Sequence, residues 1–296
     1  MKKIITFLIL TSLISCNKSN EKADGYGNFE ATEVTISAEA NGKIEYLKLE
    51  EGDVLDSKTQ VGLIDTTQLY FNKQQLIASK STVYSKSVNV LSQIKVLQEQ
   101  LKTAQIEKKR IQNMFAENAA TKRQVDEIDG KVNVILEQIK GVETQNAPIV
   151  NETKSIDVQI EKINDQIQKS KIINPIKGTV LAKYSEPNEV TAFGKPLYKI
   201  ADISEMTVRV YISENQLSNI KVGQKVTVKI DSQKEMKSLP GTISWIASSA
   251  EFTPKVVQTK EERVNLVYAV KVKVKNGGTL KIGMPAEMWI NESKKI

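Results

Sequence analysis

The chain has 296 residues, a formal net charge of +7, no histidine and a single cysteine. Without histidine it lacks the commonest general base and metal ligand, and one cysteine allows neither an internal disulfide nor a cysteine metal cluster. The positive charge is spread thinly, with no basic block or aromatic stripe for stacking bases, which argues against nucleic-acid binding. Aromatic residues make up 5% of the chain, which favours coiled coil and small β modules over a large enzyme core.

The first sixteen residues have the pattern of an export signal. Two lysines precede an apolar run over residues 4–14, which suits a signal-peptide core and is too short to span a bilayer. The run ends in Leu13-Ile14-Ser15-Cys16, which resembles the bacterial lipobox, in which the cysteine is acylated. We expect a signal peptide over residues 1–15, lipidation of Cys16 and a flexible tether over residues 16–28. An uncleaved anchor with an incidental thiol is the alternative.

Two similar halves are predicted on either side of a long insertion, over residues 29–66 and 171–202. Each half contains short β-like runs separated by turn residues. Four positions recur at nearly the same spacing: Gly42, Gly52, Val54 and Asp65 correspond to Gly178, Asn188, Val190 and Asp202. Asparagine replaces glycine readily in such turns because it tolerates the left-handed backbone conformation. The repeat predicts one pseudo-symmetric β-sandwich.

The insertion, residues 67–170, is predicted to form two long helices folded back on each other. Apolar residues recur every seven positions in both legs, which indicates a left-handed coiled coil. A second column, four residues further on, mixes polar and apolar residues and ends the first leg with Phe115. The first seam consists of Leu69, Leu76, Val83, Val90, Leu97, Ala104 and Ile111, and the second of Ile128, Ile135, Val142, Ile149, Ile156 and Ile163.

The turn between the legs is predicted at residues 118–120, where the heptads are interrupted. Thr121 and Gln124 have the spacing of a capping box at the start of the second leg. Pro148 is expected to kink that leg without ending it. Each leg has about 50 residues and therefore measures roughly 75 Å. A rod of this length spans a distance and does not enclose a substrate.

Residues 203–296 alternate apolar and polar residues over several short segments with glycines between them. Val270, Val272 and Val274, for example, are separated by lysines that we place on a solvated face. This pattern predicts a small antiparallel β-barrel, with one or two helical turns over residues 213–221. The expected fold class is therefore α+β: a long antiparallel two-helix coiled-coil hairpin inserted in a split β-sandwich, followed by a small antiparallel β-barrel.

Four segments together carry a family resemblance: residues 28–34 (Asn-Phe-Glu-Ala-Thr-Glu-Val), 42–44, 51–54 and 174–180 (Asn-Pro-Ile-Lys-Gly-Thr-Val). They resemble the periplasmic adaptor, or membrane fusion protein, family of HlyD type, in which a lipoyl-like sandwich carries the hairpin. Lipoyl and biotinyl carrier domains share that sandwich but need an exposed lysine at the turn that the hairpin replaces here. The resemblance therefore implies a protein with no cofactor and no enzymatic activity.

The same resemblance implies partners. Such an adaptor links an inner-membrane transporter to a TolC-type outer-membrane channel and self-associates into a ring, hexameric in the family. Residues 251–255, 261–263 and 280–285 resemble adaptors of ATP-binding-cassette (ABC) pumps. The end of the chain soon after its last strand also favours an ABC pump over a proton-driven one. The expected location is the periplasm, with the lipid in the inner membrane. A structural or adhesive coiled-coil lipoprotein is the rival interpretation, but it would not need two matching half-domains.

The hairpin tip carries the candidate docking residues. Adaptors of this family resemble one another in an Arg-x3-Leu-x6-Ser spacing that docks on the channel, and Arg110, Met114 and Thr121 keep that spacing here. Leucine has become methionine and serine has become threonine. A purely structural interpretation is also open, in which Met114 closes the coil, Thr121 caps the second leg and Arg110 is simply exposed.

Overall fold

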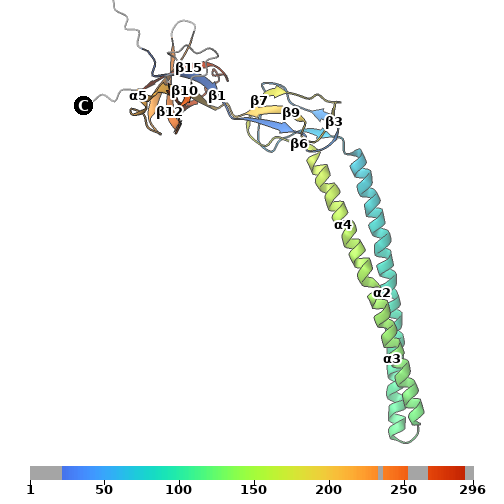
Figure 1. Ribbon diagram of the computed structural model, residues 1–296. Coiled ribbons are helices and arrows are strands. Elements are labelled where there is room, and N and C mark those ends of the chain that lie inside the picture. The colour runs from blue at the N-terminus through green and yellow to red at the C-terminus, as the bar shows by residue number, and fades with distance from the viewer. Residues whose placement is uncertain (1–21, 233–235, 253–265, 291–296) are drawn as a thin grey trace, which may run out of the picture.

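The computed structural model describes residues 22–232, 236–252 and 266–290. Figure 1 shows an elongated molecule in which a β-barrel, a β-sandwich and a helical hairpin follow one another, with the hairpin turn at the far end. The predicted fold class is confirmed: the hairpin is inserted in a split sandwich, and the barrel is a closed antiparallel sheet.

The hairpin consists of α2 (Thr67–Ala116) in one leg and α3 (Lys122–Thr144) with α4 (Asn146–Lys169) in the other. All the predicted seam residues are buried or partly buried, so the seven-residue period is confirmed. The second column also faces inward, except for Phe115, whose side chain is 42% exposed. At about 1.5 Å per residue, the 50 residues of α2 give a rod of about 75 Å.

Three polar members of the second column in α2 bond to polar residues of the other leg. Ser87 donates a hydrogen bond of 2.7 Å to Asn146 Oδ1, and Lys80 and Lys108 form ion pairs with Asp157 and Asp129. The Lys80–Asp157 and Lys108–Asp129 distances are 2.6 and 2.9 Å. These pairs satisfy polar groups along the seam and fix the register of two legs that apolar contacts alone would leave free to slide.

The return leg is divided near Pro148 but keeps its register. Proline cannot donate a hydrogen bond to the residue four positions earlier, which here is Thr144. The helix α3 ends at Thr144, and α4 begins at Asn146 after the single residue Gln145, whose backbone stays helical (φ −73°, ψ −19°). Ile149 and Ile156 beyond the break remain in the seam. The division is therefore local, as expected for a kink that does not end the leg.

The sandwich consists of two four-stranded sheets, and each sheet takes two strands from each half of the sequence repeat. One sheet has the order β2 (Glu33–Ser37), β9 (Pro196–Ala201), β7 (Gly178–Lys183) and β4 (Val54–Leu55). The other has the order β6 (Lys171–Ile173), β5 (Gln60–Ile64), β3 (Gly42–Leu47) and β8 (Val190–Thr191).

The two halves exchange strands symmetrically, as the internal repeat predicted. Strand β3 of the first half pairs with β8 of the second, while β7 of the second half pairs with β4 of the first. The matched turn residues Gly52 and Asn188 both have a positive φ, +97° and +74°. Neither half can therefore complete a sheet without the other, although the whole hairpin separates them in sequence.

The barrel is a closed antiparallel sheet of six strands with β13 (Glu251–Phe252) added outside. Pairing of β10 with β14 closes the ring, and the four-residue helix α5 (Glu214–Leu217) follows β10. The order around the barrel is β10 (Glu205–Ser213), β1 (Gly25–Glu30), β15 (Pro285–Ile290), β11 (Lys225–Ile230), β12 (Lys237–Ile246) and β14 (Leu266–Lys275).

Strand β1 corrects the expected boundaries. Residues 25–28 were expected in a flexible tether and residues 29 and 30 in the sandwich, but residues 26–30 pair with β10 and residues 25–28 with β15, both in the barrel. Phe29 is fully buried in the barrel core. The physical reason is closure: β1 fills the gap between β10 and β15, which otherwise would each expose an unpaired edge.

Gly27 shows why a segment that resembles a tether can be a strand. A Cβ atom on Gly27 would lie 1.8 Å from the carbonyl oxygen of Arg209 and 2.7 Å from the Cα atom of Val210, both on β10. We expect Gly27→Ala to destabilise the barrel by about 1–3 kcal/mol, because β1 must move away from β10. Tryptophan fluorescence during urea unfolding measures this loss, since the two tryptophans of the chain, Trp245 and Trp289, lie in β12 and β15.

The matched control for this prediction is Gly130→Ala in α3, where an added Cβ meets nothing within 4 Å. We expect that change to stabilise the hairpin by roughly 0.5–1 kcal/mol, because alanine favours a helix interior. A Gly27→Ala protein with an unchanged fluorescence transition would contradict the close approach of β1 to β10.

Candidate docking site at the hairpin tip

The position of the tip depends first on how the base of the hairpin is held. Helix α2 starts three residues after β5, and α4 ends two residues before β6, and these two strands pair antiparallel. At the junction, the backbone N–H of Ile64 donates a 2.8 Å hydrogen bond to the carbonyl of Ser170. Both helix ends are therefore tied to one sheet, and the rod leaves the sandwich in a defined direction.

A fully buried asparagine joins the two halves of the sandwich beneath the hairpin. Asn174 Nδ2 donates to the carbonyls of Asp56 (2.9 Å) and Ile176 (2.6 Å), and Asn174 Oδ1 accepts from the Tyr198 hydroxyl at 3.1 Å. Its backbone N–H and carbonyl bond to Thr59 and Lys58. Since every polar group of this buried residue is satisfied, the network specifies one arrangement of the two halves.

A second contact between the halves is the side chain of Lys183, which is only 7% exposed. Its Nζ lies 2.8 Å from Glu186 and 3.0 Å from Glu50 of the first half. The hydrogen bond to Glu186 raises the pKa of Lys183 against the opposing effect of burial. The lysine therefore stays charged and links strand β7 to the turn before β4.

The buried hydroxyl of Tyr198 makes the sandwich sensitive to alkali. Burial raises the pKa of Tyr198 to about 12 from its ordinary value of 10. Between these two values the unfolded chain loses a proton that the folded chain keeps, so stability falls as pH rises from about 10 to 12. We expect the urea midpoint of the wild type to fall more steeply over this pH range than the midpoint of Tyr198→Phe. The ion pairs of lysine with carboxylates weaken in both proteins and do not account for a difference between them. Equal slopes would contradict the burial of this hydroxyl.

At the tip, the structure places the three candidate residues on the last two turns of α2 and the start of α3. The side chain of Arg110 is 69% exposed, and its Nη1 lies 3.3 Å from Glu107 Oε2. Met114 is 40% exposed, one turn further on. Thr121 is the N-cap of α3: its hydroxyl accepts a hydrogen bond from the N–H of Gln124, and the Gln124 side chain accepts from the N–H of Thr121. The predicted capping box is confirmed.

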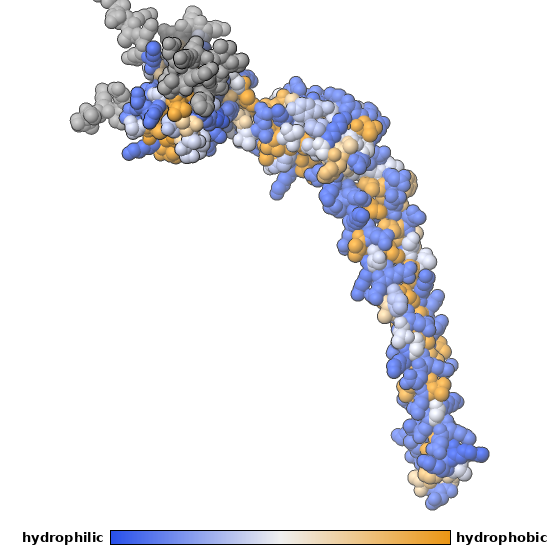
Figure 2. All heavy atoms as spheres, viewed as in Figure 1, coloured by the Kyte–Doolittle hydropathy of each residue, from blue (hydrophilic) through white to orange (hydrophobic). Residues whose placement is uncertain are grey.

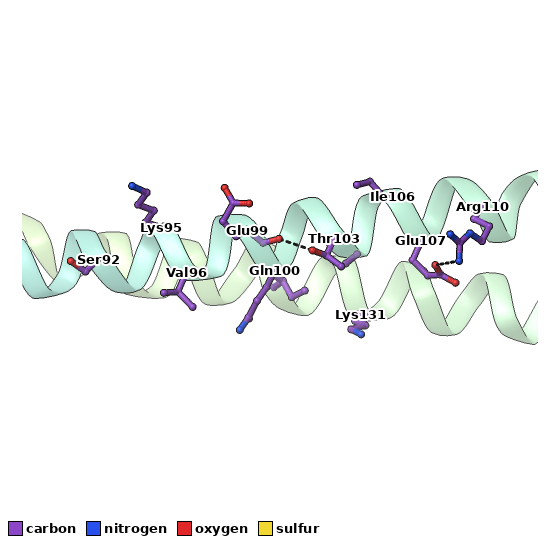
Figure 3. A pocket seen from close by; sticks show the side chains of 12 residues that line it. Ser92, Lys95, Val96, Glu99, Gln100, Thr103, Ile106, Glu107, Arg110 and Lys131 are labelled. Atoms are coloured by element: carbon purple, nitrogen blue, oxygen red, sulfur yellow. Dashed lines mark hydrogen bonds and ion pairs between the residues drawn. The ribbon is translucent and has the colours of Figure 1, made fainter.

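A shallow groove of about 1080 Å³ runs along the hairpin and ends at Arg110. Figure 3 shows its side chains mostly on α2, with Lys131 from α3, and the ion pair of Arg110 with Glu107 at one end. Val96 and Ile106 in the groove are 59% and 60% exposed. Arginine thus presents its planar set of donors at the end of a partly apolar groove, which suits recognition of a carboxylate or carbonyl.

The comparisons with known proteins agree with this architecture. Residues 206–290 match the family model of the YknX-like beta-barrel domain. The chain superimposes on the crystal structure of MacA from Actinobacillus actinomycetemcomitans with a TM-score of 0.51 and 19% identity, over 89% of this chain and 76% of that one. The membrane fusion protein Spr0693 from Streptococcus pneumoniae R6 gives a TM-score of 0.50 and 17% identity, over 89% and 96%. The chain has the membrane fusion protein fold.

Relatives in sequence cover almost the whole of this membrane fusion protein fold. A UPF0194 membrane protein of Acidithiobacillus ferridurans is 25% identical over 92% of this chain and 88% of its own length. Another UPF0194 membrane protein, from Yersinia enterocolitica, is 24% identical over 96% and 97%. These alignments thus extend over most of the hairpin, sandwich and barrel of this chain, and the shared name of the relatives describes them only as membrane proteins.

Other features of this membrane fusion protein fold bear on the predicted sites. Cys16 lies outside the described residues. Across the described ranges, no group of three or more acidic or cysteine side chains is arranged to hold a metal ion. Among the described helices, none combines the length and apolar character that a bilayer-spanning segment requires.

Sequence reasoning missed Phe115 as a member of the tip. The seven-residue period placed it in the second column, but α2 ends at Ala116 and the Phe115 side chain stays 42% exposed. The available sequence signal was Asn118, a residue type that tolerates the positive φ (+56°) found in this turn. Together, Met114 and Phe115 give the tip an apolar surface next to the charge of Arg110.

Proposed function

We propose that this protein is the adaptor subunit of a tripartite efflux or secretion system, and that it links an inner-membrane transporter to a TolC-type outer-membrane channel. The observation that carries this proposal is the rod of about 75 Å, both legs of which are held at their base by one split sandwich. A hairpin held in this way keeps its tip at a defined position far from the sandwich. A free coiled coil would not need the exchanged strands at its base.

The tip is the proposed contact with the channel. Arg110 supplies the charge, Met114 and Phe115 supply apolar surface, and Thr121 holds the start of α3 in place. Each of these contacts is small, and repetition of the tip around a ring of copies, hexameric by resemblance, would multiply their effect.

The opposite end of the molecule is the proposed contact with the inner membrane. Both described ends of the chain lie together at the barrel end far from the sandwich, where the backbone N–H of Ile290 donates a 2.7 Å hydrogen bond to Asp24. Asp24 follows Cys16 by eight residues, which extend to at most about 28 Å. Acylation of Cys16 would therefore hold this end of the barrel close to the periplasmic face of the inner membrane.

An ABC transporter is the proposed inner-membrane partner. The segment that resembles ABC-pump adaptors begins in β13, which pairs with the start of β14 at the same end of the barrel as Asp24. Arg209 fixes β13 there by donating to both oxygens of Glu251, at 2.8 and 2.9 Å. Residues 253–265 lie outside the described residues. The protein itself carries out no chemistry in this proposal and serves to join the other two components.

Chemical cross-linking in intact cells, followed by affinity purification of the full-length chain from solubilised membranes, tests the proposal. We expect an ATPase, its permease and an outer-membrane channel in the purified complex. Recovery of the channel with a proton-driven transporter would overturn the ABC assignment alone. Recovery of neither a transporter nor a channel would contradict the adaptor function and favour the structural lipoprotein.

A further inference from the structure

The hairpin tip carries a side chain that an oxidant can reach. Burial separates the five methionines of the described residues: Met206 and Met288 lie fully buried in the barrel core, and Met284 is partly buried. The other two, Met114 at the tip and Met236 just before β12, are each 40% exposed. Oxidation turns a methionine thioether into a polar sulfoxide, and an oxidant in solution meets the exposed side chains first. Met114 is therefore open to this modification.

Met114 lies outside the packed columns of the hairpin. The seam in α2 ends at Ile111 and the second column at Phe115, and Met114 belongs to neither. Its backbone carbonyl accepts a 2.7 Å hydrogen bond from the N–H of Ala119 in the turn, a bond in which its side chain takes no part. Figure 2 shows apolar atoms among the polar ones at the tip, at the lower end of the view. A change in the polarity of the Met114 side chain therefore leaves the coil and the turn in place.

The side chain of Met114 lies within reach of Arg110. The two residues are four positions apart in α2, so they share one face of the helix, with Cβ atoms about 5–6 Å apart. Side chains on a helix lean toward its N-terminus, which directs Met114 toward Arg110. The ion pair of Arg110 with Glu107, at 3.3 Å, is exposed and therefore weak. The guanidinium can exchange Glu107 for a new acceptor at little cost.

Oxidation would give Met114 an acceptor of this kind. The sulfur of a thioether accepts hydrogen bonds only weakly, whereas a sulfoxide carries a polar oxygen. That oxygen accepts a hydrogen bond from the guanidinium of Arg110 and occupies donors that recognition of a carboxylate or carbonyl requires. It also places a polar group in the apolar surface that Met114 forms with Phe115, and burial of that group at an interface is unfavourable. The oxidised tip thus loses an apolar contact and the use of its arginine.

We propose that Met114 is an oxidation site whose sulfoxide form turns off docking of the tip, with a hypohalous acid as the oxidant. This inference rests on the proposed function, because it needs a tip that docks. With hypochlorous acid, the sulfur of Met114 attacks chlorine and releases hydroxide. Water then adds to the sulfur, chloride leaves and two protons are lost, so sulfur gives two electrons to chlorine. A methionine sulfoxide reductase reverses the change, which makes the site a switch.

Binding of the oxidised full-length chain to outer-membrane fragments from the same cells tests the switch. The chain carries Cys16→Ser, so that neither an acyl group nor a thiol contributes. It is treated with hypochlorous acid and quenched before mixing, so that the channel is never oxidised. Mass spectrometry should find the added oxygen on Met114 and Met236 before Met206 or Met288. We expect the oxidised chain to bind at least tenfold more weakly than its own untreated sample and to recover after treatment with methionine sulfoxide reductase.

Single substitutions of the two exposed methionines assign the effect to one of them. Met114→Leu has no sulfur at the tip, so oxidation should change its binding less than twofold from its own untreated level. Met236→Leu removes the equally exposed methionine of the barrel and should lose binding on oxidation as the parent chain does. Met114→Gln, whose amide oxygen imitates the sulfoxide, should bind weakly without any oxidant. An equal loss in Met114→Leu and the parent chain overturns the proposal, as does a Met114 that takes up no oxygen.

The untreated chain distinguishes failure of the switch from failure of the docking function. Arg110→Glu marks the level of binding expected without docking. If the untreated parent chain binds the fragments no better than Arg110→Glu, the docking role of the tip is wrong and the switch falls with it. If the untreated chain binds well and the chain oxidised at Met114 binds within twofold of it, the switch alone is overturned and the adaptor function stands.

Discussion

Arg110→Glu is expected to reduce export to the level of a strain that lacks the protein, while the chain remains folded. In the folded chain Arg110 makes a single exposed ion pair with Glu107, and such pairs contribute at most a few tenths of a kcal/mol to helix stability. At a docked interface the same charge is desolvated, and loss of a charge partner there costs about 2–5 kcal/mol. Reversal of the charge therefore separates docking from folding.

The matched control is Lys109→Glu, which makes the same charge change on the adjacent residue, also exposed. A charge that acts only through the net potential of the rod would give equal effects at 109 and 110, and a specific contact would affect 110 alone. Arg110→Lys should retain part of the activity, because lysine keeps the charge and loses the planar donor set. Efflux of a fluorescent substrate, or growth in the presence of the exported compound, measures the outcome. Export at wild-type level in Arg110→Glu would remove Arg110 from the docking site.

Asn174→Leu is expected to destabilise the sandwich by about 3–5 kcal/mol. Leucine fills nearly the same volume but leaves the carbonyls of Asp56 and Ile176 and the hydroxyl of Tyr198 without partners in a buried site. Each unsatisfied buried group costs about 1–3 kcal/mol. Since a small domain is stabilised by only about 5–15 kcal/mol, the two halves would separate at moderate denaturant concentrations and release the base of the hairpin.

Two spectroscopic signals distinguish this effect from general unfolding. Both tryptophans lie in the barrel, so the fluorescence transition of Asn174→Leu should match that of the wild type. Circular dichroism at 222 nm, which the long hairpin dominates, should show its transition at lower urea. Asn151→Leu on the exposed surface of α4 is the control and should change stability by less than about 0.5 kcal/mol. If the barrel transition moves together with the helical one, the two domains are not independent.

The features predicted correctly from the sequence are those fixed by a period or a repeat. The seven-residue period identified the seam because a supercoiled pair must bury the same column over many turns. The recurrence of Gly42, Gly52 and Asp65 as Gly178, Asn188 and Asp202 identified the split sandwich. Asp65 and Asp202 make equivalent turns, each accepting a hydrogen bond from the N–H two residues later, at 2.8 and 2.9 Å. Hydrogen bonding by the side chain of Thr67 or Ser204, together with this backbone contact, lowers the pKa of each aspartate.

The features missed from the sequence depend on contacts with distant segments. Strand β1 looks like a tether because Gly25 and Gly27 are typical of flexible segments, and only the backbone of β10 beside Gly27 explains the missing side chain. The kink of the return leg, in contrast, was expected from Pro148 and is local; it falls at Gln145, three residues before that proline. At the tip, Thr121 is confirmed as a cap, whereas the docking role of Arg110 and Met114 stays a prediction because a binding surface has no period to reveal it.

Site-specific photo-cross-linking in living cells tests the bridging role most directly. A photoreactive amino acid replaces Ala119 at the tip in one strain, and Val222, exposed just before β11 at the far end of the barrel, in another. Lys140, exposed on the return leg, is the control position. The bridge predicts that position 119 captures only an outer-membrane channel and position 222 only an inner-membrane transporter. Capture of the same partner from positions 119 and 222, or of the inner-membrane transporter from the tip, would contradict it.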